Sequence, residues 1–291
     1  MAVHTDQVIS IVSDSQLLAE YHYSPDERKP YFHPLYLPPL SEPVTCFRPW
    51  DHIWHTGLWF AWKYLNSINF WEEGPQIQEA LGSTIAIATS PVATVGTAAV
   101  WSQRLEWVTD AGERLLTEER HLKFWRDIPG GAWAIDWTSE FTAVEQVELN
   151  RTDPTQPNTP WGGYGGLFMR LSRAFWGKEF FLDSAGRTDR AQIHSQTARW
   201  VDQSGRPDGS YDSWQQWAGI AIFDHPQNLR HPTPWYTLPW LVGPAPLYHE
   251  PFSLAPGERL SLRYRVLAHL GQGTAERIEA AYRAWLAEPQ A

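Results

Sequence analysis

Residues 114–125 read RLLTEERHLKFW, and residues 132–149 read AWAIDWTSEFTAVEQVEL. In the first stretch Leu122 and Phe124 occupy alternate positions, and Lys123 stands between them. Side chains along a β-strand point to opposite faces in turn, so this alternation predicts a long strand with one buried and one solvated face. The same pattern in the second stretch predicts another strand of the same kind.

Turn-forming residues separate the alternating runs, at residues 110–112, 129–131 and 255–257. Strands joined by such turns are typical of antiparallel sheets. Thr274 is a suitable N-cap for a helix whose apolar residues share one face, namely Ile278, Ala281, Tyr282, Trp285 and Leu286. The sequence therefore predicts an all-β protein: a large antiparallel β-sandwich with one C-terminal helix, built as a single domain over residues 1–291.

The chain of 291 residues contains 18 tryptophans and has a formal net charge of −10 at pH 7. An acidic chain repels nucleic acid and anionic membranes, so we expect neither as a partner. The single cysteine, Cys46, excludes an intramolecular disulfide and a cysteine-based metal site. No basic or apolar leader is visible, and glycine and proline interrupt the longest uncharged stretch, residues 80–103. We therefore expect a soluble, cytoplasmic protein.

A first cluster of reactive residues is Asp51-His52-Ile53-Trp54-His55, which leads into an apolar aromatic stretch. Imidazoles titrate near neutral pH, so His52 and His55 are candidate catalytic bases. On a turn, residues three apart can share one side, whereas on a regular strand they point to opposite faces. Asp51 and Trp54 are candidate substrate-binding residues beside them. The alternative is two histidines that only make hydrogen bonds within the fold.

A second cluster, residues 224–235 with the sequence DHPQNLRHPTPW, directly follows an apolar run that is predicted to be a strand. Asp224 and His225 form an acid–imidazole pair suited to catalysis. The candidate substrate-binding groups that follow are Asn228, Arg230, His231 and Trp235. We expect the two clusters to line one pocket, because each adjoins a buried strand with aromatic neighbours. Alternatively, the prolines shape a rigid loop in which Asp and Asn cap turns.

Two further positions add candidate site residues. Arg170 lies in an apolar run, where a charge needs either an ion-pair partner or a ligand oxygen. His249 and Glu250 form another acid–imidazole pair, with Glu250 a candidate catalytic acid and His249 a candidate substrate contact. No His-x-His or His-Glu-x-x-His spacing is present, so neither a metal nor another cofactor is predicted.

Several segments together resemble a bacterial family of unknown function labelled PmoA-like, or "methane oxygenase PmoA". The shared order is RKPYFHP at 28–34, DHxxHxGLWF at 51–60, NFW at 69–71, the glycine-rich run ending at Arg170, and residues 219–235. The resemblance implies a supersandwich similar to galactose mutarotase, with a carbohydrate on the concave sheet face. Ile53, Trp54 and Thr56 replace residues of the family's usual Asp-His-Pro-His-His-Arg pattern. No membrane-spanning segment is predicted, so we do not expect the methane oxygenase activity that the label names.

The residues and the resemblance together predict a carbohydrate-active enzyme using acid–base chemistry on a sugar or keto-sugar, by mutarotation, epimerisation or elimination. His52 or His55 would be the base, and a group of the second cluster or Glu250 the acid. Arg170 and Arg230 would hold substrate oxygens, and the expected partner is a small-molecule sugar. Two alternatives stay open: a carbohydrate-binding protein without turnover, in which tryptophans stack on the sugar, and a metal-dependent hydrolase or oxygenase.

Overall fold

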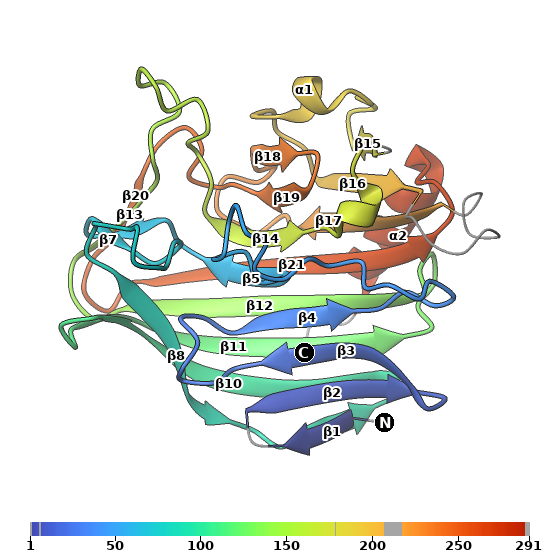
Figure 1. The fold of residues 1–291 in the computed structure, drawn as a ribbon, viewed down its shortest axis with the longest axis horizontal. Coiled ribbons are helices and arrows are strands. Elements are labelled where there is room, and N and C mark those ends of the chain that lie inside the picture. The colour runs from blue at the N-terminus through green and yellow to red at the C-terminus, as the bar shows by residue number, and fades with distance from the viewer. Residues whose placement is uncertain (1, 6, 178, 207–216, 289–291) are drawn as a thin grey trace.

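The structure is a computed structural model that describes residues 2–5, 7–177, 179–206 and 217–288. Two large antiparallel sheets and one small sheet make up most of it (Figure 1). The first large sheet has eight strands, in spatial order β1 (Ala2–Thr5), β2 (Val8–Ser13), β3 (Gln16–His22), β4 (Tyr31–Leu35), β5 (Leu58–Ala61), β14 (Gly166–Arg170), β19 (Leu241–Pro244) and β18 (Trp235–Leu238).

The second large sheet has nine strands and contains the longest ones. Eight of them follow in spatial order as β15 (Phe180–Asp183), β16 (Trp200–Gly205), β17 (Ala218–Asp224), β21 (Arg259–Leu270), β12 (Trp133–Ala143), β11 (Arg114–Arg126), β10 (Ala98–Thr109) and β8 (Gly82–Thr89). The ninth strand, β9 (Ala93–Val95), also pairs with β10. A four-stranded sheet follows the order β20 (Phe252–Leu254), β13 (Val147–Asn150), β6 (Tyr64–Leu65) and β7 (Ile68–Asn69).

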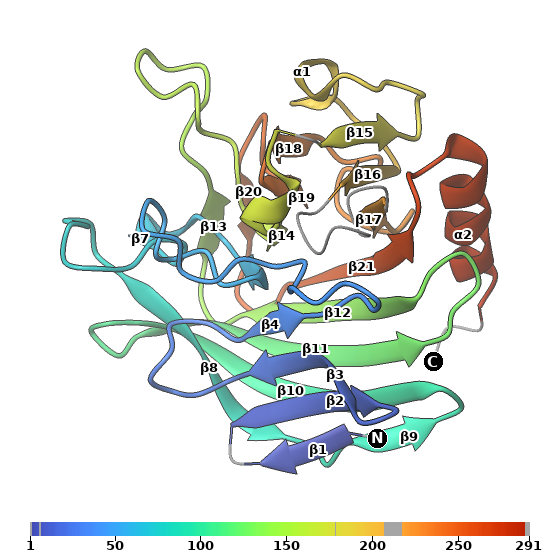
Figure 2. The same cartoon turned by 45° about the vertical axis from the view of Figure 1, so that its right-hand side comes forward.

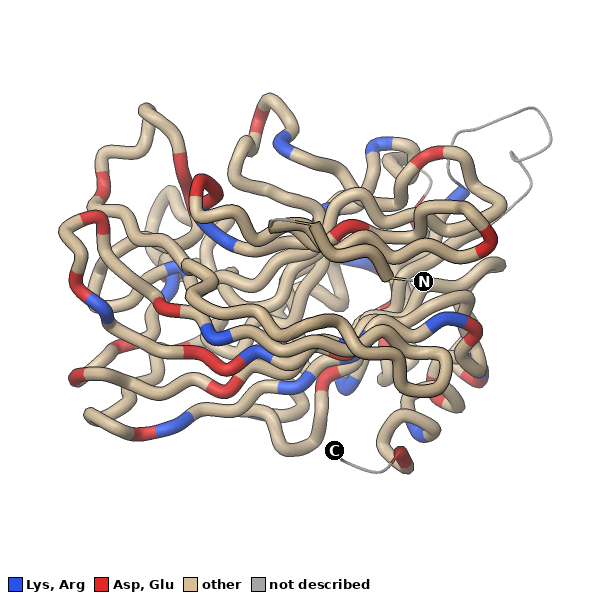
Figure 3. Tube along the Cα trace, turned by 90° about the horizontal axis from the view of Figure 1, so that it is seen from below, with Lys and Arg blue, Asp and Glu red and all other residues tan. Residues whose placement is uncertain are grey.

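The main core lies between the two large sheets, which Figure 3 shows edge-on as two layers. Tyr21 of β3 packs against Trp101 of β10, with ring centroids 5.6 Å apart. Phe32 of β4 packs against Trp137 of β12 at 6.1 Å. Aromatic side chains bury large apolar areas, so contacts of this kind supply most of the driving force that joins the layers. The predicted all-β sandwich is confirmed.

One predicted strand is divided in the structure. The alternating stretch 132–149 predicts a single strand, but β12 ends at Ala143 and β13 begins at Val147. The amide of Val144 donates to the carbonyl of Leu115, after which the chain leaves the large sheet and β13 joins the small one. Alternation marks which face of a strand is buried, and it does not show that the strand changes its partners.

The predicted C-terminal helix is α2 (Ala275–Ala287), and Thr274 caps it by accepting a hydrogen bond from the amide of Arg277 at 3.4 Å. Its buried residues Ile278, Ala281 and Tyr282 cover the outer face of the nine-stranded sheet (Figure 2). The other described helices are short: the 3-10 turn η1 (Arg173–Phe175) and α1 (Arg190–Ile193). Among the described helices, none has the length and apolar character required to cross a membrane.

Candidate functional site

A second aromatic cluster covers the outer face of the eight-stranded sheet, on the side away from the main core. On β5, Leu58 and Phe60 face the main core, whereas Trp59 faces this outer cluster. The loops before β5 and β14 add walls that enclose a pocket of about 340 Å³, a size suited to a small-molecule ligand. Its lining residues are His52, Trp54, His55, Trp71, Glu72, Trp161, Tyr164, Tyr236, Leu238 and Leu241.

The loop of residues 48–57 presents two histidines to this pocket. The amide of His52 donates to the carbonyl of Pro49, and the amide of His55 donates to the carbonyl of His52. These successive turns place the two imidazole rings in a stack, with centroids 4.8 Å apart and planes 17° apart. The stack continues to Trp59, whose ring centroid lies 5.0 Å from that of His55. The sequence allowed either a turn or a regular strand at residues 52–55, and the structure has a turn there.

The same loop is fastened at both ends, so its histidines have a defined position. Arg48 donates hydrogen bonds of 2.5 Å to Glu27 and to Glu73. Gly57 ends the loop with a φ of +87°, and a Cβ at this position would lie 2.3 Å from the carbonyl oxygen of Phe32. A side chain at residue 57 would therefore be excluded both by the backbone conformation and by the neighbouring strand.

Two different charges lie beside the two histidines. Oδ2 of Asp51 is 3.1 Å from Nδ1 of His52, although the two groups are not aligned for a linear hydrogen bond. Nδ1 of His55 instead accepts a hydrogen bond from the guanidinium of Arg170 at 3.3 Å. A ring nitrogen that accepts carries no proton, so the neutral His55 ring has its proton on Nε2.

Burial keeps His55 uncharged, whereas Asp51 stays ionised. Only 3% of His55 is exposed, and desolvation followed by the positive charge of Arg170 lowers its pKa well below the ordinary value. Desolvation opposes ionisation of Asp51, but the His52 ring, a backbone hydrogen bond and Arg170 together lower its pKa. The Arg170 guanidinium, which donates to His55, also lies 3.4 Å from the Asp51 carboxylate beside His52. The surroundings of the two histidines are therefore linked through Arg170.

The other end of the pocket contains a carboxylate and a phenol. Oε1 of Glu72 accepts a hydrogen bond from the hydroxyl of Tyr164 at 2.8 Å, and Oε2 accepts from Asn69 at 2.7 Å and from the ammonium of Lys63. Burial raises the pKa of Tyr164 well above its ordinary value, so the phenol keeps its proton. Trp71 lies between the two ends, with its ring 6.2 Å from His55 and 4.9 Å from Tyr164.

The sequence patterns did not indicate this second end of the pocket. Lys63, which directly follows the aromatic run of residues 57–62, was the available signal. A lysine beside apolar neighbours needs a buried anion as its partner. Glu72 is that anion. The sequence did not show which of the many carboxylates would meet Lys63.

The predicted convergence of the two clusters on one pocket is wrong. Asp224 ends β17, and its carboxylate accepts hydrogen bonds from Asn228 at 2.8 Å and from the amide of Thr233 at 3.1 Å. His231 lies 2.8 Å from the same carboxylate. Burial raises the pKa of Asp224, while these partners oppose the rise. The polar groups of this segment therefore hold its own loop in place. This agrees with the alternative prediction of a rigid, proline-shaped loop in which Asp and Asn cap turns.

The remaining candidates of this region also lie outside the pocket. Arg230 donates to the carbonyl oxygens of Pro246 and Glu250, both at 2.7 Å. The exposed side chain of Glu250 pairs with Arg230 at 3.1 Å, and His249 is an exposed residue whose ring packs against Tyr248. Trp235 is fully buried in the main core and donates to the carbonyl of Ala198.

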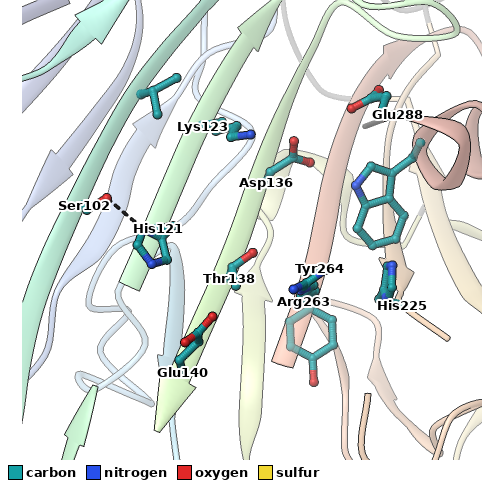
Figure 4. A pocket seen from close by; sticks show the side chains of 12 residues that line it. Ser102, His121, Lys123, Asp136, Thr138, Glu140, His225, Arg263, Tyr264 and Glu288 are labelled. Carbon is teal, nitrogen blue, oxygen red and sulfur yellow. Dashed lines mark hydrogen bonds between the residues drawn. The ribbon is translucent and has the colours of Figure 1, made fainter. Parts of the chain in front are cut away.

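His225 lies on another surface, the outer face of the nine-stranded sheet. Figure 4 shows it at one side of a groove whose floor is formed by strand residues such as His121 and Thr138. Its ring meets that of Trp285 of α2 edge-on at 5.4 Å. His52 and His225 thus occupy the opposite outer faces of the sandwich. Both clusters adjoin a buried strand, as expected, but the two strands belong to different sheets.

No group of three or more His, Cys, Asp or Glu side chains has an arrangement suited to a metal ion, within the part of the chain that the structure describes. Of the predicted site residues, the structure brings together five in and directly behind the aromatic pocket: Asp51, His52, Trp54, His55 and Arg170.

Fold and pocket define an all-β sandwich protein with a small-molecule-sized pocket on one outer face. Residues 8–283 match the model of a family described as "Family of unknown function (DUF6807)", and the chain belongs to that family. No curated protein matches the chain significantly. One solved structure that matches is the Slr1438 protein from Synechocystis sp. PCC 6803, with 10% identity, a TM-score of 0.38, and coverage of 90% of this chain and 95% of that chain.

Proposed function

We propose that the protein is a carbohydrate-active enzyme that moves a proton on a sugar or keto-sugar bound in the aromatic pocket. The observation that supports this most is the pair of stacked imidazoles with unlike neighbours: the Asp51 carboxylate beside His52 and the Arg170 cation beside His55. Acid–base catalysis needs two groups that differ in proton affinity and reach the same substrate. The stack meets this requirement within one pocket wall.

In this proposal His52 is the base. The adjacent carboxylate of Asp51 favours a proton on Nδ1, which leaves the lone pair of Nε2 for the substrate. The side chain of His52 is 39% exposed and lines the pocket, so a ligand reaches it without any rearrangement of the loop.

His55 serves as a neutral hydrogen-bond donor. Arg170 donates to Nδ1 and so fixes the tautomer, which places the proton on Nε2 at the other side of the ring. A substrate carbonyl oxygen would accept from this N–H while His52 removes the proton from the neighbouring carbon. The C–H electron pair then forms the C=C bond of an enolate, whose oxygen the His55 N–H stabilises. Protonation of the opposite face of the enolate carbon by water gives an epimer, and departure of a β-hydroxyl as water, with the proton that His52 holds, gives an elimination product.

The rest of the pocket suits a sugar ring. Trp54 presents an indole surface on which C–H groups of a pyranose or furanose pack, and the buried Trp71 also lines the pocket. The Glu72–Tyr164 pair supplies acceptor atoms for hydroxyl groups at the end remote from the histidines. The similarity to PmoA-like proteins and to galactose mutarotase, expected from the sequence, agrees with a carbohydrate ligand and stays a prediction.

Exchange of substrate C–H protons with D₂O tests the proposal before any product is known. Aldoses, ketoses and keto-sugar acids are incubated with the protein in D₂O and followed by proton NMR. We expect enzyme-dependent deuterium incorporation next to the carbonyl in at least one sugar, and at least a 100-fold loss of its rate in His52→Ala. His225→Ala, on the opposite face, is the control and should retain the full rate.

Two outcomes contradict this function. Sugar binding by the wild-type protein with no exchange would exclude proton removal from carbon and leave a carbohydrate-binding protein without turnover or a mutarotase. An unchanged exchange rate in His52→Ala would place the chemistry elsewhere in the molecule.

A further inference from the structure

The tryptophans of this protein differ sharply in exposure. Nine of them are buried, whereas three of the described ones are half-exposed or more: Trp50 at 83%, Trp161 at 50% and Trp176 at 53%. Trp214 lies outside the described residues. An indole in water leaves a large apolar surface unburied, so a concentration of exposed indoles on one part of a protein marks a binding surface.

All three exposed indoles belong to segments around the aromatic pocket. Trp161 lines the pocket itself and stacks on Tyr164, with centroids 6.3 Å apart and planes 28° apart. Trp50 directly precedes Asp51 in the loop that carries the two histidines. An exposed indole thus lines the pocket at the Tyr164 end, and the loop that carries the two histidines contains another.

Trp176 belongs to the Asp51 end by a chain of contacts. Its ring meets that of Trp240 at 4.9 Å, and Trp240 lies 5.2 Å below the guanidinium of Arg170. Trp176 directly follows the short helix η1, whose first residue is Arg173. The guanidinium of Arg173 lies 3.6 Å from the carboxylate of Asp51. Trp50 and Trp176 therefore both belong to segments that contain or contact Asp51, the carboxylate that adjoins the proposed base.

Exposed aliphatic side chains lie elsewhere in the structure. The large exposed ones among the described residues are Val3, Ile87, Val95, Val144 and Leu270, and none comes from the segments that form the pocket. A protein interface is normally built around one continuous, desolvated core with a polar rim. Separate indoles around an aromatic pocket with polar groups at its two ends instead suit a ligand with repeated flat apolar faces and hydroxyl edges, which describes a chain of sugar units.

We infer that the ligand is an oligosaccharide: one unit occupies the pocket, and further units stack on Trp50 and Trp176 at one end or on Trp161 at the other. This inference rests on the proposed function only in that the pocket takes a sugar. It adds that recognition extends beyond one unit and that the exposed indoles supply it.

Calorimetric titration with sugars of increasing length provides the test. The probes are glucose, xylose, galactose and mannose, each with its β-1,4-linked oligosaccharides of two to five units. In at least one series we expect the dissociation constant to fall at least tenfold from one unit to three. Trp50→Ala, Trp176→Ala and Trp161→Ala are compared with Ile87→Ala, an exposed apolar control remote from the pocket.

Loss of one stacking contact predicts that at least one indole variant weakens binding of the trimer threefold to tenfold. Trp50→Ala and Trp176→Ala, which lie outside the pocket lining, should leave binding of the single unit unaffected, and the Ile87→Ala control should change neither. Equal affinity for one and three units, or no effect of any indole variant, would overturn the oligosaccharide inference and leave the proposed function standing. Absence of binding in every series would overturn the oligosaccharide inference, whereas the proposed function fails only if no sugar in the D₂O experiment shows enzyme-dependent exchange. A wild-type dimer that Trp50→Ala or Trp176→Ala converts to a monomer in sedimentation would show that the indoles form a protein interface instead.

Discussion

Glu118 and Arg120 lie inside the main core, with 1% and 0% of their surface exposed. Their carboxylate and guanidinium form two hydrogen bonds, of 2.7 and 2.9 Å. Trp107 and Ser139 also donate to the carboxylate, and Arg120 donates to the hydroxyl of Tyr21 on the facing sheet. Each buried charge thus depends on its partner, because neither one has water as an alternative.

Removing one charge of this pair should cost more stability than removing both. We expect Glu118→Leu to lower the free energy of unfolding by about 3–5 kcal/mol, because it leaves the Arg120 cation buried without a counter-charge. The double variant Glu118→Leu/Arg120→Leu should recover most of that loss. Chemical denaturation of both single variants and the double variant measures the coupling. Equal and additive losses would show that the pair makes no specific contribution.

At the scale of elements, the connection from β21 into α2 is the most constrained. The buried Asp202 accepts a hydrogen bond from Ser204 at 2.5 Å and lies 2.7 Å from Nε2 of His269. Ser204 in turn accepts from the amide of Gly273, the residue before the helix cap. A Cβ on Gly273 would lie 2.1 Å from Oδ2 of Asp202, so this backbone is pressed directly against the buried carboxylate.

Gly273→Ala should therefore displace the start of α2. We expect a loss of at least about 2 kcal/mol in the free energy of unfolding, the usual result of adding an atom to a close-packed site. Gly96→Ala is the control, because it has a φ of +60° and open space around the new Cβ. Backbone strain alone should cost it about 1–2 kcal/mol. Denaturation midpoints compare the two, and a smaller loss at Gly273 than at Gly96 would contradict the packing argument.

Across the whole molecule, four buried or half-buried histidines share one response to pH. Desolvation lowers the pKa of His33 to about 4, lowers that of His55 well below its ordinary value, and lowers those of His194 and His225. At a pH between the lowered pKa of each folded histidine and the ordinary value of 6.5, the unfolded chain binds more protons than the folded one. The free energy of unfolding therefore falls as the pH falls through this range. The raised pKa of Asp224 acts in the opposite direction at lower pH.

We therefore expect the melting temperature to fall continuously from pH 7 to pH 4.5, with net proton uptake on unfolding. His33→Gln should reduce this dependence, because its group no longer takes up a proton. His121→Gln, an exposed position on the outer sheet face, should leave it unchanged. Scanning calorimetry at several pH values measures both, and a melting temperature that stays constant or rises on acidification would refute the assignment.

The sequence by itself determined the alternating faces of the long strands β11 and β12 and the C-terminal helix, because alternation and capping are local properties of the chain. It also indicated Asp51, His52, His55 and Arg170, whose residue types are unusual beside apolar aromatic runs. Only the tertiary structure decided that His225 faces away from them. β5 pairs with β4 and β14, whereas β17 pairs with β16 and β21. Which sheet a strand joins depends on pairing between distant segments, and no local pattern in the chain encodes that choice.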